Sequence, residues 1–477
     1  MSLKKIFVGG VFWSFIQQFS TQLISFLVQL VLARTLLPAE FGLIGMLTVF
    51  IGVGSALFEG GMTISLIRES STDSRDYSTV FIFNLIVSIL IYILFFLSAP
   101  YIAQFYNQPL LTDIARLYGL SFIFLAFGTV QNTILVKEMN FKKQAYLAFP
   151  SLVIGSSLGV YLAINNFGVW ALVYSVLLTN FCNAFLLWIT SDWRPNFCFD
   201  RDKFKVHFYF GYKMTISSLL DTIFINIYQI LIGKLYNPVL VGYYTRANSL
   251  VMLPVGNISA VLNKVIFPLF SAVENDTLEL KKLYKKIMLM IFFIIAPMIV
   301  LMILLSKEIV IILFTEKWLP IVPIFQVLCL SGLLYPLHLY NLMILQVKGK
   351  SGLFLKLEII KKIMVVIVVG ISVLFGFYGL LFGSVISSVL ALFINTFYAG
   401  KFIQYKMFSQ LFDLSPTIII SFIMAAVMYV LNLYLVDFAI FSRLVLIGTS
   451  GILTYLTFAV ILKNESTNEI IKAIKTL

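Results

Sequence analysis

The stretch ARTLLPAEFG at residues 33–42 is matched two hundred residues later by GKLYNPVLVG at residues 233–242. Both stretches contain a cation, three residues, a proline, three more residues and a glycine. A cation ends a helix near its negative dipole end, a proline blocks continuation of that helix, and a glycine lets the backbone reverse. The pair therefore predicts the same helix–turn–helix unit twice, which is an internal repeat.

The helix before each turn carries polar side chains at intervals that place them on one helical face. On the first helix these are Gln18, Thr21, Ser25 and Gln29, and on the second they are Ser218, Asp221 and Gln229. Hydrogen bonds between helices are one explanation for such a face. Because the two faces occupy equivalent places in the repeat, we interpret them as the walls of a polar cavity between two lobes.

The composition excludes a water-soluble fold. Of 477 residues, 60% are hydrophobic and 12% are charged, and the mean hydropathy is +1.00, whereas soluble chains carry about 25% charged residues. Connections are all shorter than about twenty residues, so no catalytic domain fits outside the membrane. The sequence predicts an all-α polytopic membrane protein with fourteen spans, at 10–33, 42–66, 78–104, 113–135, 145–164, 169–190, 208–232, 242–267, 284–306, 320–346, 356–375, 378–400, 415–436 and 443–462.

The lysines and arginines fix the predicted orientation of these spans. If the N-terminus is cytoplasmic, 25 of them fall on the cytoplasmic side and seven on the other, which is the distribution that the positive-inside rule predicts. Both termini are then cytoplasmic. The net charge of +13 is an orientation signal, and no nucleic-acid partner is expected.

The repeat also predicts how the chain divides. Residues 1–200 form an N-lobe of helices 1–6, residues 201–405 a C-lobe of helices 7–12, and residues 406–477 a last helix pair with a cytoplasmic tail. An even number of spans in each copy gives both copies the same orientation. The pseudo-twofold axis is then expected along the membrane normal.

Charged residues inside the spans are candidate functional residues, because a charge at the bilayer centre costs about 2.5–3.5 kcal/mol on insertion scales. Lys213 and Lys264 either snorkel to the cytoplasmic surface or form a cationic entrance for a diphosphate. Asp221 needs a counter-ion, a proton or water. Glu59 lines the cavity or packs through a salt bridge to Lys264. The outer ends of the spans add Arg34 and Arg246.

Metal and nucleophile chemistry finds little support in the sequence. The three cysteines form no CxxC or Cys/His pair, so a disulfide framework or zinc site is not expected. The two histidines, His207 and His338, are isolated in the sequence and predict neither a catalytic triad nor a metal site. The pairs Gly155/Gly159 and Gly379/Gly383 predict close helix packing.

Three stretches and the fourteen-span layout together carry a family resemblance. They are ARTLLPAEFG (33–42), FEGGMTISLIRE (58–69) and VIFPLFSAVENDTLELKKLYKK (265–286), joined by Ala296-Pro297. The sequence resembles the polysaccharide transporter (Wzx-type O-antigen and colanic acid exporter) family of the multidrug/oligosaccharidyl-lipid/polysaccharide flippase superfamily. The motif positions of this family are Arg34, Pro38, Gly42, Glu59 and Pro268 in this sequence.

The resemblance implies a flippase for polyprenyl-diphosphate-linked oligosaccharides in the bacterial inner membrane. It implies two six-helix lobes that rock about a cavity lined by helices 1, 2, 7 and 8. No cofactor is implied beyond a coupling ion, H⁺ or Na⁺, and no specific ion-binding motif is present. Contacts with polysaccharide polymerase and assembly proteins are also implied.

Three rival functions are weighed against this one. A multidrug or cation antiporter of the same superfamily predicts a cavity dominated by carboxylates and aromatic residues, and usually twelve spans. A polytopic glycosyltransferase or polymerase requires a sizeable outer loop with acidic residues or histidine, and no outer loop here exceeds about fourteen residues. A peptidoglycan-precursor flippase meets the same physical requirements, and only the style of the motifs disfavours it.

Overall fold

The computed structural model describes residues 3–59, 61–69, 71–196 and 198–462, and the side chains of 3–12, 14–16, 59 and 261–265 lie outside this description. Within these ranges the chain forms nineteen α-helices and two 3-10 helices, without a strand. The predicted all-α class is therefore confirmed.

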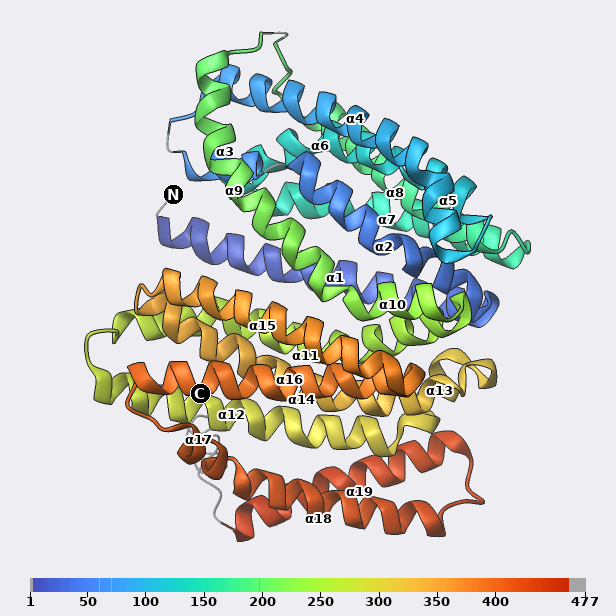
Figure 1. Cartoon of the computed structure of the whole chain (residues 1–477), viewed down its shortest axis with the longest axis vertical. Helices are drawn as coiled ribbons and strands as arrows, with labels where there is room; N and C mark the ends of the chain where they lie inside the picture. Colours follow the sequence, from blue (N-terminus) through green and yellow to red (C-terminus); the bar gives the residue numbers. More distant parts are fainter. Residues whose placement is uncertain (1–2, 60, 70, 197, 463–477) are drawn as a thin grey trace. The chain divides into compact units, whose positions relative to one another are not determined.

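The helices follow one another with short connections (Figure 1). The first ten are α1 (Leu3–Thr35), α2 (Pro38–Glu59), α3 (Met62–Arg68), α4 (Ser74–Tyr106), α5 (Leu111–Tyr118), α6 (Leu120–Lys137), α7 (Phe141–Ile164), α8 (Val169–Thr190), α9 (Arg201–Ile225) and α10 (Ile227–Leu235). The others are α11 (Pro238–Ala272), α12 (Thr277–Leu304), α13 (Ser306–Phe314), η1 (Glu316–Trp318), α14 (Ile321–Val347), α15 (Ser351–Ser372), η2 (Val373–Phe375), α16 (Gly376–Phe402), α17 (Met407–Asp413), α18 (Ser415–Tyr434) and α19 (Ile440–Ile461).

Among the described residues, ten helical stretches are long and apolar enough to cross a membrane. The number is eleven if the pair α9–α10, bent by 48°, counts as one span. The protein is thus a polytopic membrane protein with ten to eleven candidate spans in its described part. The predicted count of fourteen is not confirmed by these helices.

Several predicted spans are interrupted at identifiable residues. The predicted helix 42–66 ends at Glu59, and α3 follows after Gly61, whose φ of 62° is a left-handed conformation that suits glycine. The predicted helix 113–135 is divided into α5 and α6 at Gly119. The predicted helix 208–232 is broken at Asn226, between α9 and α10. Hydropathy locates apolar stretches but is insensitive to such local breaks.

The chain divides into two compact units, Met1–Gly242 and Tyr243–Leu477. Unit 1 contains α1–α10 and the first turn of α11, and unit 2 contains the remainder. The boundary lies inside α11, because α9 and α10 pack on α2, α3 and α4 of unit 1. The six-helix lobes with a boundary at residue 200 stay a prediction.

The two copies of the repeated turn have the same local structure and contact each other within unit 1. In one copy α1 ends at Thr35 and α2 begins at Pro38, and in the other α10 ends at Leu235 and α11 begins at Pro238. A Cβ atom on Gly42 would overlap the carbonyl group of Pro238, and a Cβ atom on Gly242 would overlap the carbonyl group of Pro38. The contact is therefore reciprocal and leaves room only for glycine.

Close helix contacts elsewhere also depend on glycine. Gly155 and Gly159 on α7 face Thr179 and Ser175 on α8, and a Cβ atom at either glycine would overlap these side chains. Gly383 on α16 faces Ser372 at the end of α15 in the same way. The interpretation of both small-residue pairs as packing contacts is confirmed.

In unit 2 the final two helices attach through an apolar cluster and one ion pair. Helices α18 and α19 form an antiparallel pair (Figure 1), and Met424, Met428 and Tyr455 pack with Phe293 of α12. Arg443 of α19 places its Nη2 atom 3.0 Å from Oε1 of Glu308 in α13, and both side chains are largely buried. The pair therefore ties α19 to α13.

Candidate functional site

The polar face predicted on α1 is partly exposed. Gln18, Gln29 and Arg34 are exposed, whereas Thr21 and Ser25 are half-buried. The hydroxyl of Thr21 donates to the carbonyl oxygen of Gln17 at 2.7 Å, so its own helix already accepts its proton. The contact of these five side chains with a substrate stays a prediction.

The polar face predicted on the second repeat lies on both sides of the bend between α9 and α10. Lys213, Ser218 and Asp221 on α9 are exposed, and the Lys213 ammonium lies 4.2 Å from the centre of the Tyr209 ring, a cation–π contact. Gln229 on α10 is buried and donates from Nε2 to the carbonyl oxygen of Gly45 on α2. Thus α9 presents its polar groups, whereas the amide of Gln229 fastens α10 to α2.

The remaining predicted site residues are only partly visible. Arg246 on α11 is half-buried. The side chains of Glu59 and Lys264 lie outside the described residues, and so does the salt bridge proposed between them.

A cavity of about 310 Å³ with both apolar and uncharged polar walls opens within unit 1 between α2, α3, α6 and α8. This volume is at the lower end of the range of about 300–1,000 Å³ for small-molecule sites. Phe58 and Phe124 contribute apolar walls. The polar lining is uncharged and consists of Thr63, Thr129, Asn132, Thr133, Asn180 and Asn183.

The hydrogen bonds of this lining leave two amides available. Thr129 and Thr133 donate to carbonyl groups of their own helix, and Asn132 accepts from Gln144 at 2.8 Å. In the described part of the chain, the side-chain amides of Asn180 and Asn183 have no protein hydrogen-bond partner. Uncharged donors and acceptors between aromatic walls suit a hydroxyl-rich ligand better than an organic cation.

Sequence reasoning missed this cavity, although a signal was available. Asn180 and Asn183 are two carboxamides within one apolar helix of spanning length, 169–190, and intramembrane polar residues of this kind favour a buried contact or a cavity. The internal repeat does not include these two residues, so they are not part of the polar faces that it predicts.

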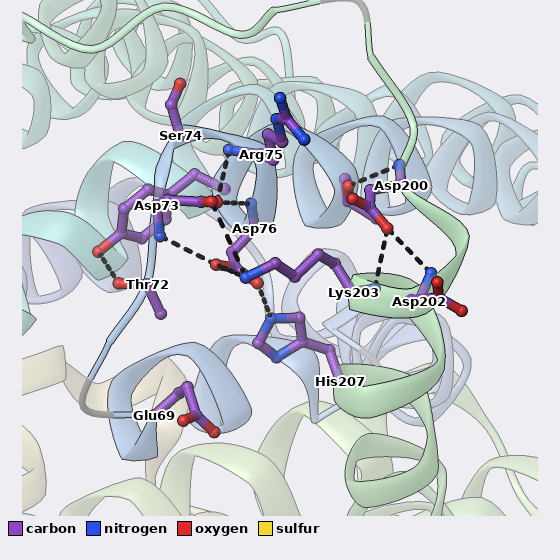
Figure 2. A network of polar contacts seen from close by, with 12 residues as sticks. Glu69, Thr72, Asp73, Ser74, Arg75, Asp76, Asp200, Asp202, Lys203 and His207 are labelled. Carbon is purple, nitrogen blue, oxygen red and sulfur yellow. Dashed lines mark hydrogen bonds and ion pairs between the residues drawn. The ribbon is translucent and has the colours of Figure 1, made fainter.

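A second group, the His207 cluster (Ser65, Asp76, Lys203 and His207), joins α9 to α3 and α4. Figure 2 shows Asp76, Lys203 and His207 of this cluster. The interpretation of the histidines as isolated is wrong for the folded chain. The Nδ1 atom of His207 lies 2.9 Å from the hydroxyl of Ser65, and Nε2 lies 3.1 Å from Oδ1 of Asp76. His338 likewise contacts the hydroxyl of Ser388 at 2.9 Å.

Helix caps build the His207 cluster. Asp73 caps α4 by accepting from the backbone N–H groups of Arg75 and Asp76, and Asp76 accepts in return from the N–H of Asp73. This capping box fixes Asp76 in the first turn. Asp200 caps α9, which brings Lys203 to 2.9 Å from Asp76.

The connectivity Ser65–His207–Asp76 is that of a catalytic triad, but its environment is not. All three side chains are buried, so the hydroxyl of Ser65 is inaccessible to a substrate, whereas a nucleophilic serine must reach one. Within the described residues no group of three or more His, Cys, Asp and Glu side chains is placed to hold a metal ion. The cluster is therefore a buried polar contact between helices.

Comparison with known families matches residues 31–323, more than half of the chain, to the family described as "Polysaccharide biosynthesis protein". The chain belongs to the polysaccharide biosynthesis protein family. The resemblance found in the motifs is thereby confirmed. Because this is a family of transporters, the glycosyltransferase and polymerase alternatives are excluded.

Two relatives in this family are named after bacterial polysaccharides. The teichuronic acid biosynthesis protein TuaB of Bacillus subtilis (strain 168) is 29% identical over 298 residues, which are 61% of this chain and 61% of TuaB. The lipopolysaccharide biosynthesis protein WzxC of Escherichia coli (strain K12) is 24% identical over 446 residues, 90% of this chain and 89% of WzxC. The family member described here is a polytopic membrane protein, and its named relatives are biosynthesis proteins of bacterial polysaccharides.

The fold of this polysaccharide biosynthesis protein has a counterpart among solved structures. The lipid II flippase MurJ in an inward closed conformation matches with a TM-score of 0.76 at 15% identity, over 95% of this chain and 99% of that chain. At this identity the likeness establishes the fold, and it leaves the substrate open.

Proposed function

We propose that the chain is a flippase that moves a polyprenyl-diphosphate-linked oligosaccharide across the bacterial inner membrane by alternating access. The family match over residues 31–323 carries the proposal. It is supported by the similarity to WzxC along nine-tenths of the chain and by the MurJ-like fold. The cargo is a lipopolysaccharide O-antigen, capsule or exopolysaccharide repeat unit.

Unit 1 contains polar groups that could replace the hydration of a sugar diphosphate head group during its passage through the membrane. A hydrated, charged head group crosses hydrocarbon only if protein or water replaces its hydration, while the polyprenyl tail remains in lipid. The uncharged cavity with Asn180 and Asn183 offers hydrogen bonds to sugar hydroxyls. The exposed cation of Lys213 on α9 offers a charge to the diphosphate.

Site residues are assigned to roles in this scheme. Lys213 and Lys264 bind the diphosphate on loading. The polar faces of α1 and α9 contact the sugars, through Gln18, Thr21, Ser25, Gln29, Ser218 and Asp221. Gln229, which the sequence also placed on this face, instead holds α10 against α2. Arg34, Glu59 and Arg246 contribute to the translocation path. An ion gradient of H⁺ or Na⁺ drives the cycle, and polysaccharide polymerase and assembly proteins contact the exporter.

The proposed topology has fourteen spans with both termini in the cytoplasm. Beyond the eleven candidates, α1 has 33 residues and α11 has 35, long enough to span, and both include residues outside the described side chains. The 52-residue stretch Ser351–Phe402 contains two helices, α15 and α16, which pack on each other. These features support three further spans.

Deletion of the gene in its native host tests the proposed function. We expect polyprenyl-diphosphate-linked glycan to accumulate in the inner leaflet and the surface polysaccharide to be lost, and a plasmid copy to reverse both effects. The variant Lys213→Met is expected to restore export less well than Lys213→Arg, because only arginine retains a cation. Normal surface polysaccharide without accumulation in the deletion strain would contradict the proposal.

A further inference from the structure

The connection between α16 and α17 in unit 2 is a closed turn, which we call the Tyr405 turn (residues 400–406). The backbone N–H of Tyr405 donates to the carbonyl oxygen of Gly400 at 2.9 Å, and a Cβ atom on Gly400 would overlap the carbonyl oxygen of Tyr405. Lys401 and Lys406 each follow one of these two hydrogen-bonded residues, so the turn brings the backbones of the two lysines together. Both lysine side chains are exposed.

A third lysine reaches this turn from α12. The Nζ atom of Lys281 lies 5.5 Å from the centre of the Tyr405 ring, which is a cation–π contact. In a similar contact, Nζ of Lys401 lies 4.4 Å from the centre of the Phe397 ring on α16. Aromatic rings thus hold two of the three ammonium groups in place. Below, the three lysines of the turn are Lys281, Lys401 and Lys406.

The carboxylate next to the turn already has partners. Asp413, the last residue of α17, accepts a hydrogen bond from the hydroxyl of Tyr405 and lies 3.2 Å from Nζ of Lys285. In the described part of the chain, the three lysines of the turn form no ion pair. They therefore leave a local excess of positive charge, which an anionic ligand would complement.

Helix length and charge place α17 at the membrane surface. Helix α18 has 20 residues, or about 30 Å, so it matches the thickness of the hydrocarbon core by itself. The ion pair between Lys285 and Asp413 lies where α17 meets α18, and charged groups avoid the hydrocarbon. Helix α17 and the Tyr405 turn therefore lie at the level of the lipid head groups.

At this level α17 presents two aromatic side chains. Phe408 and Phe412 are 76% and 77% exposed, and their spacing of four residues places them on one helical face. The opposite face is fixed, because the buried Gln410 amide hydrogen-bonds to the Tyr284 hydroxyl at 2.9 Å and to the Tyr405 carbonyl at 2.8 Å. Apolar side chains on such a helix contact the boundary between head groups and acyl chains.

We propose that the Tyr405 turn and α17 form a binding site for an anionic phospholipid of the surrounding bilayer. The three lysines of the turn bind the phosphate of the head group, and Phe408 and Phe412 contact the acyl chains. Phosphatidylglycerol has the required chemistry, because its phosphate carries the only charge of the head group. In a zwitterionic phospholipid a cation accompanies the phosphate, and the lysines repel that cation.

The location of the site agrees with the proposed orientation of the chain. In that orientation this end of α16 faces the cytoplasm, and the cytoplasmic leaflet carries a negative surface potential. The site lies in unit 2, whereas the cavity with Asn180 and Asn183 lies in unit 1. Lipid binding at the turn is therefore independent of the proposed glycan transport.

The number of lysines determines the expected preference between lipids. One lysine near an anionic membrane surface strengthens binding about fivefold, so three give about a hundredfold. Salt screens exposed charges and lowers this figure. We therefore expect the site to prefer phosphatidylglycerol over phosphatidylcholine by at least about tenfold.

Fluorescence quenching at one position of the full-length chain tests the site. A bimane is attached at Ser409→Cys on α17, in a background with the three native cysteines replaced, and the protein is placed in phosphatidylcholine nanodiscs. The quencher is phosphatidylglycerol or phosphatidylcholine, each with the same nitroxide on an acyl chain. Half-maximal quenching is expected at a mole fraction at least about tenfold lower for phosphatidylglycerol. A smaller ratio would overturn the proposal.

Two variants and a second label position assign the preference to the Tyr405 turn. Lys401→Gln/Lys406→Gln is expected to lower the preference at least about tenfold. The matched control Lys142→Gln/Lys205→Gln removes two exposed lysines of unit 1 and should leave the preference unchanged. A bimane at Tyr434→Cys, exposed at the other end of α18, should show no preference. The opposite result in any of these three measurements would contradict the assignment.

Salt provides a test that needs no lysine variant. Between about 0.1 M and about 1 M NaCl the Debye length falls from about 10 Å to about 3 Å, so a preference that comes from exposed lysines should decrease. An unchanged preference at high salt would contradict the role of the lysines. None of these measurements uses a glycan, so failure of this proposal is distinguishable from failure of the proposed function.

Discussion

Gly42 is the residue at which the repeated turns are most tightly fitted. A methyl group there would overlap the backbone carbonyl of Pro238, which cannot rotate away as a side chain can. We expect Gly42→Ala to lower the free energy of unfolding by at least about 1–3 kcal/mol, the usual cost of overpacking. The measurement is the melting temperature of the purified protein, which should fall. Gly370→Ala is the control, because nothing lies within 4 Å of its Cβ position. It should gain about 0.5–1 kcal/mol as a helix-interior alanine. Equal melting temperatures for the two variants would contradict the reciprocal contact.

Asn180 and Asn183 can be tested together because both face the cavity of unit 1. A hydrogen bond of about 1–1.5 kcal/mol corresponds to about a tenfold change in rate, so the double variant Asn180→Leu/Asn183→Leu should reduce glycan export at least about tenfold. Its melting temperature should not fall, because the amides lack protein partners in the described part of the chain. The control is Asn165→Leu, at an exposed position between α7 and α8. Undiminished export by the double variant would remove the cavity from the pathway.

At the scale of elements, the attachment of α19 to α13 depends on a buried ion pair. Glu308→Leu leaves Arg443 without its carboxylate, and breaking such a pair costs about 3–5 kcal/mol. The double variant Glu308→Leu/Arg443→Met removes both charges and should be closer to the parent in stability than either single variant. Thermal unfolding of the four proteins measures the coupling. If the stability losses of the two single variants add up in the double variant, the 3.0 Å contact between Arg443 and Glu308 contributes little to stability.

The elements that sequence predicts well are those determined by neighbouring residues. The helix ends after α1 and α10 are predicted correctly, because the proline that follows each of them begins the next helix. The predicted role of the glycine is wrong: Gly42 and Gly242 lie inside α2 and α11, where they allow the close contact between the two turns instead of a reversal of the backbone. The breaks at Gly61, Gly119 and Asn226 were missed because an interrupted helix and a continuous one have the same mean hydropathy. The break at Gly61 differs from the other two because the sequence contains a sign of it. The pair Gly60-Gly61 is compatible with a left-handed backbone conformation, and Gly61 adopts one, with a φ of 62°.

At the scale of the whole molecule, the charge distribution predicts which connections face the cytoplasm. Cys198, exposed in the connection between α8 and α9, is expected to react with a membrane-impermeant maleimide only after the cells are permeabilised. Asn107→Cys, at the exposed end of α4, is expected to react in intact spheroplasts. Each measurement uses a chain with the other cysteines replaced. The reverse pattern would invert the proposed orientation.

The functional groups of the molecule were only partly predictable. Lys213, Ser218 and Asp221 are exposed on α9, as a polar face on a spanning helix suggests. The pairing of His207 with Asp76 was not foreseen, because nothing local to either residue indicates a partner more than a hundred positions away. Gln229 shows the reverse case, in which a correct local pattern leads to a wrong role. Its spacing matches the polar face, but after the bend at Asn226 its side chain hydrogen-bonds to the carbonyl oxygen of Gly45.

The reciprocal contact between the repeated turns has a consequence for the history of the gene. If the repeat arose by duplication, each copy limits which residues the other can accept. The backbone of Pro38 leaves no space for a side chain at position 242, and the backbone of Pro238 leaves none at position 42. Neither copy can then diverge at these positions unless the other changes with it. Two segments separated by two hundred residues are thereby inherited as one unit.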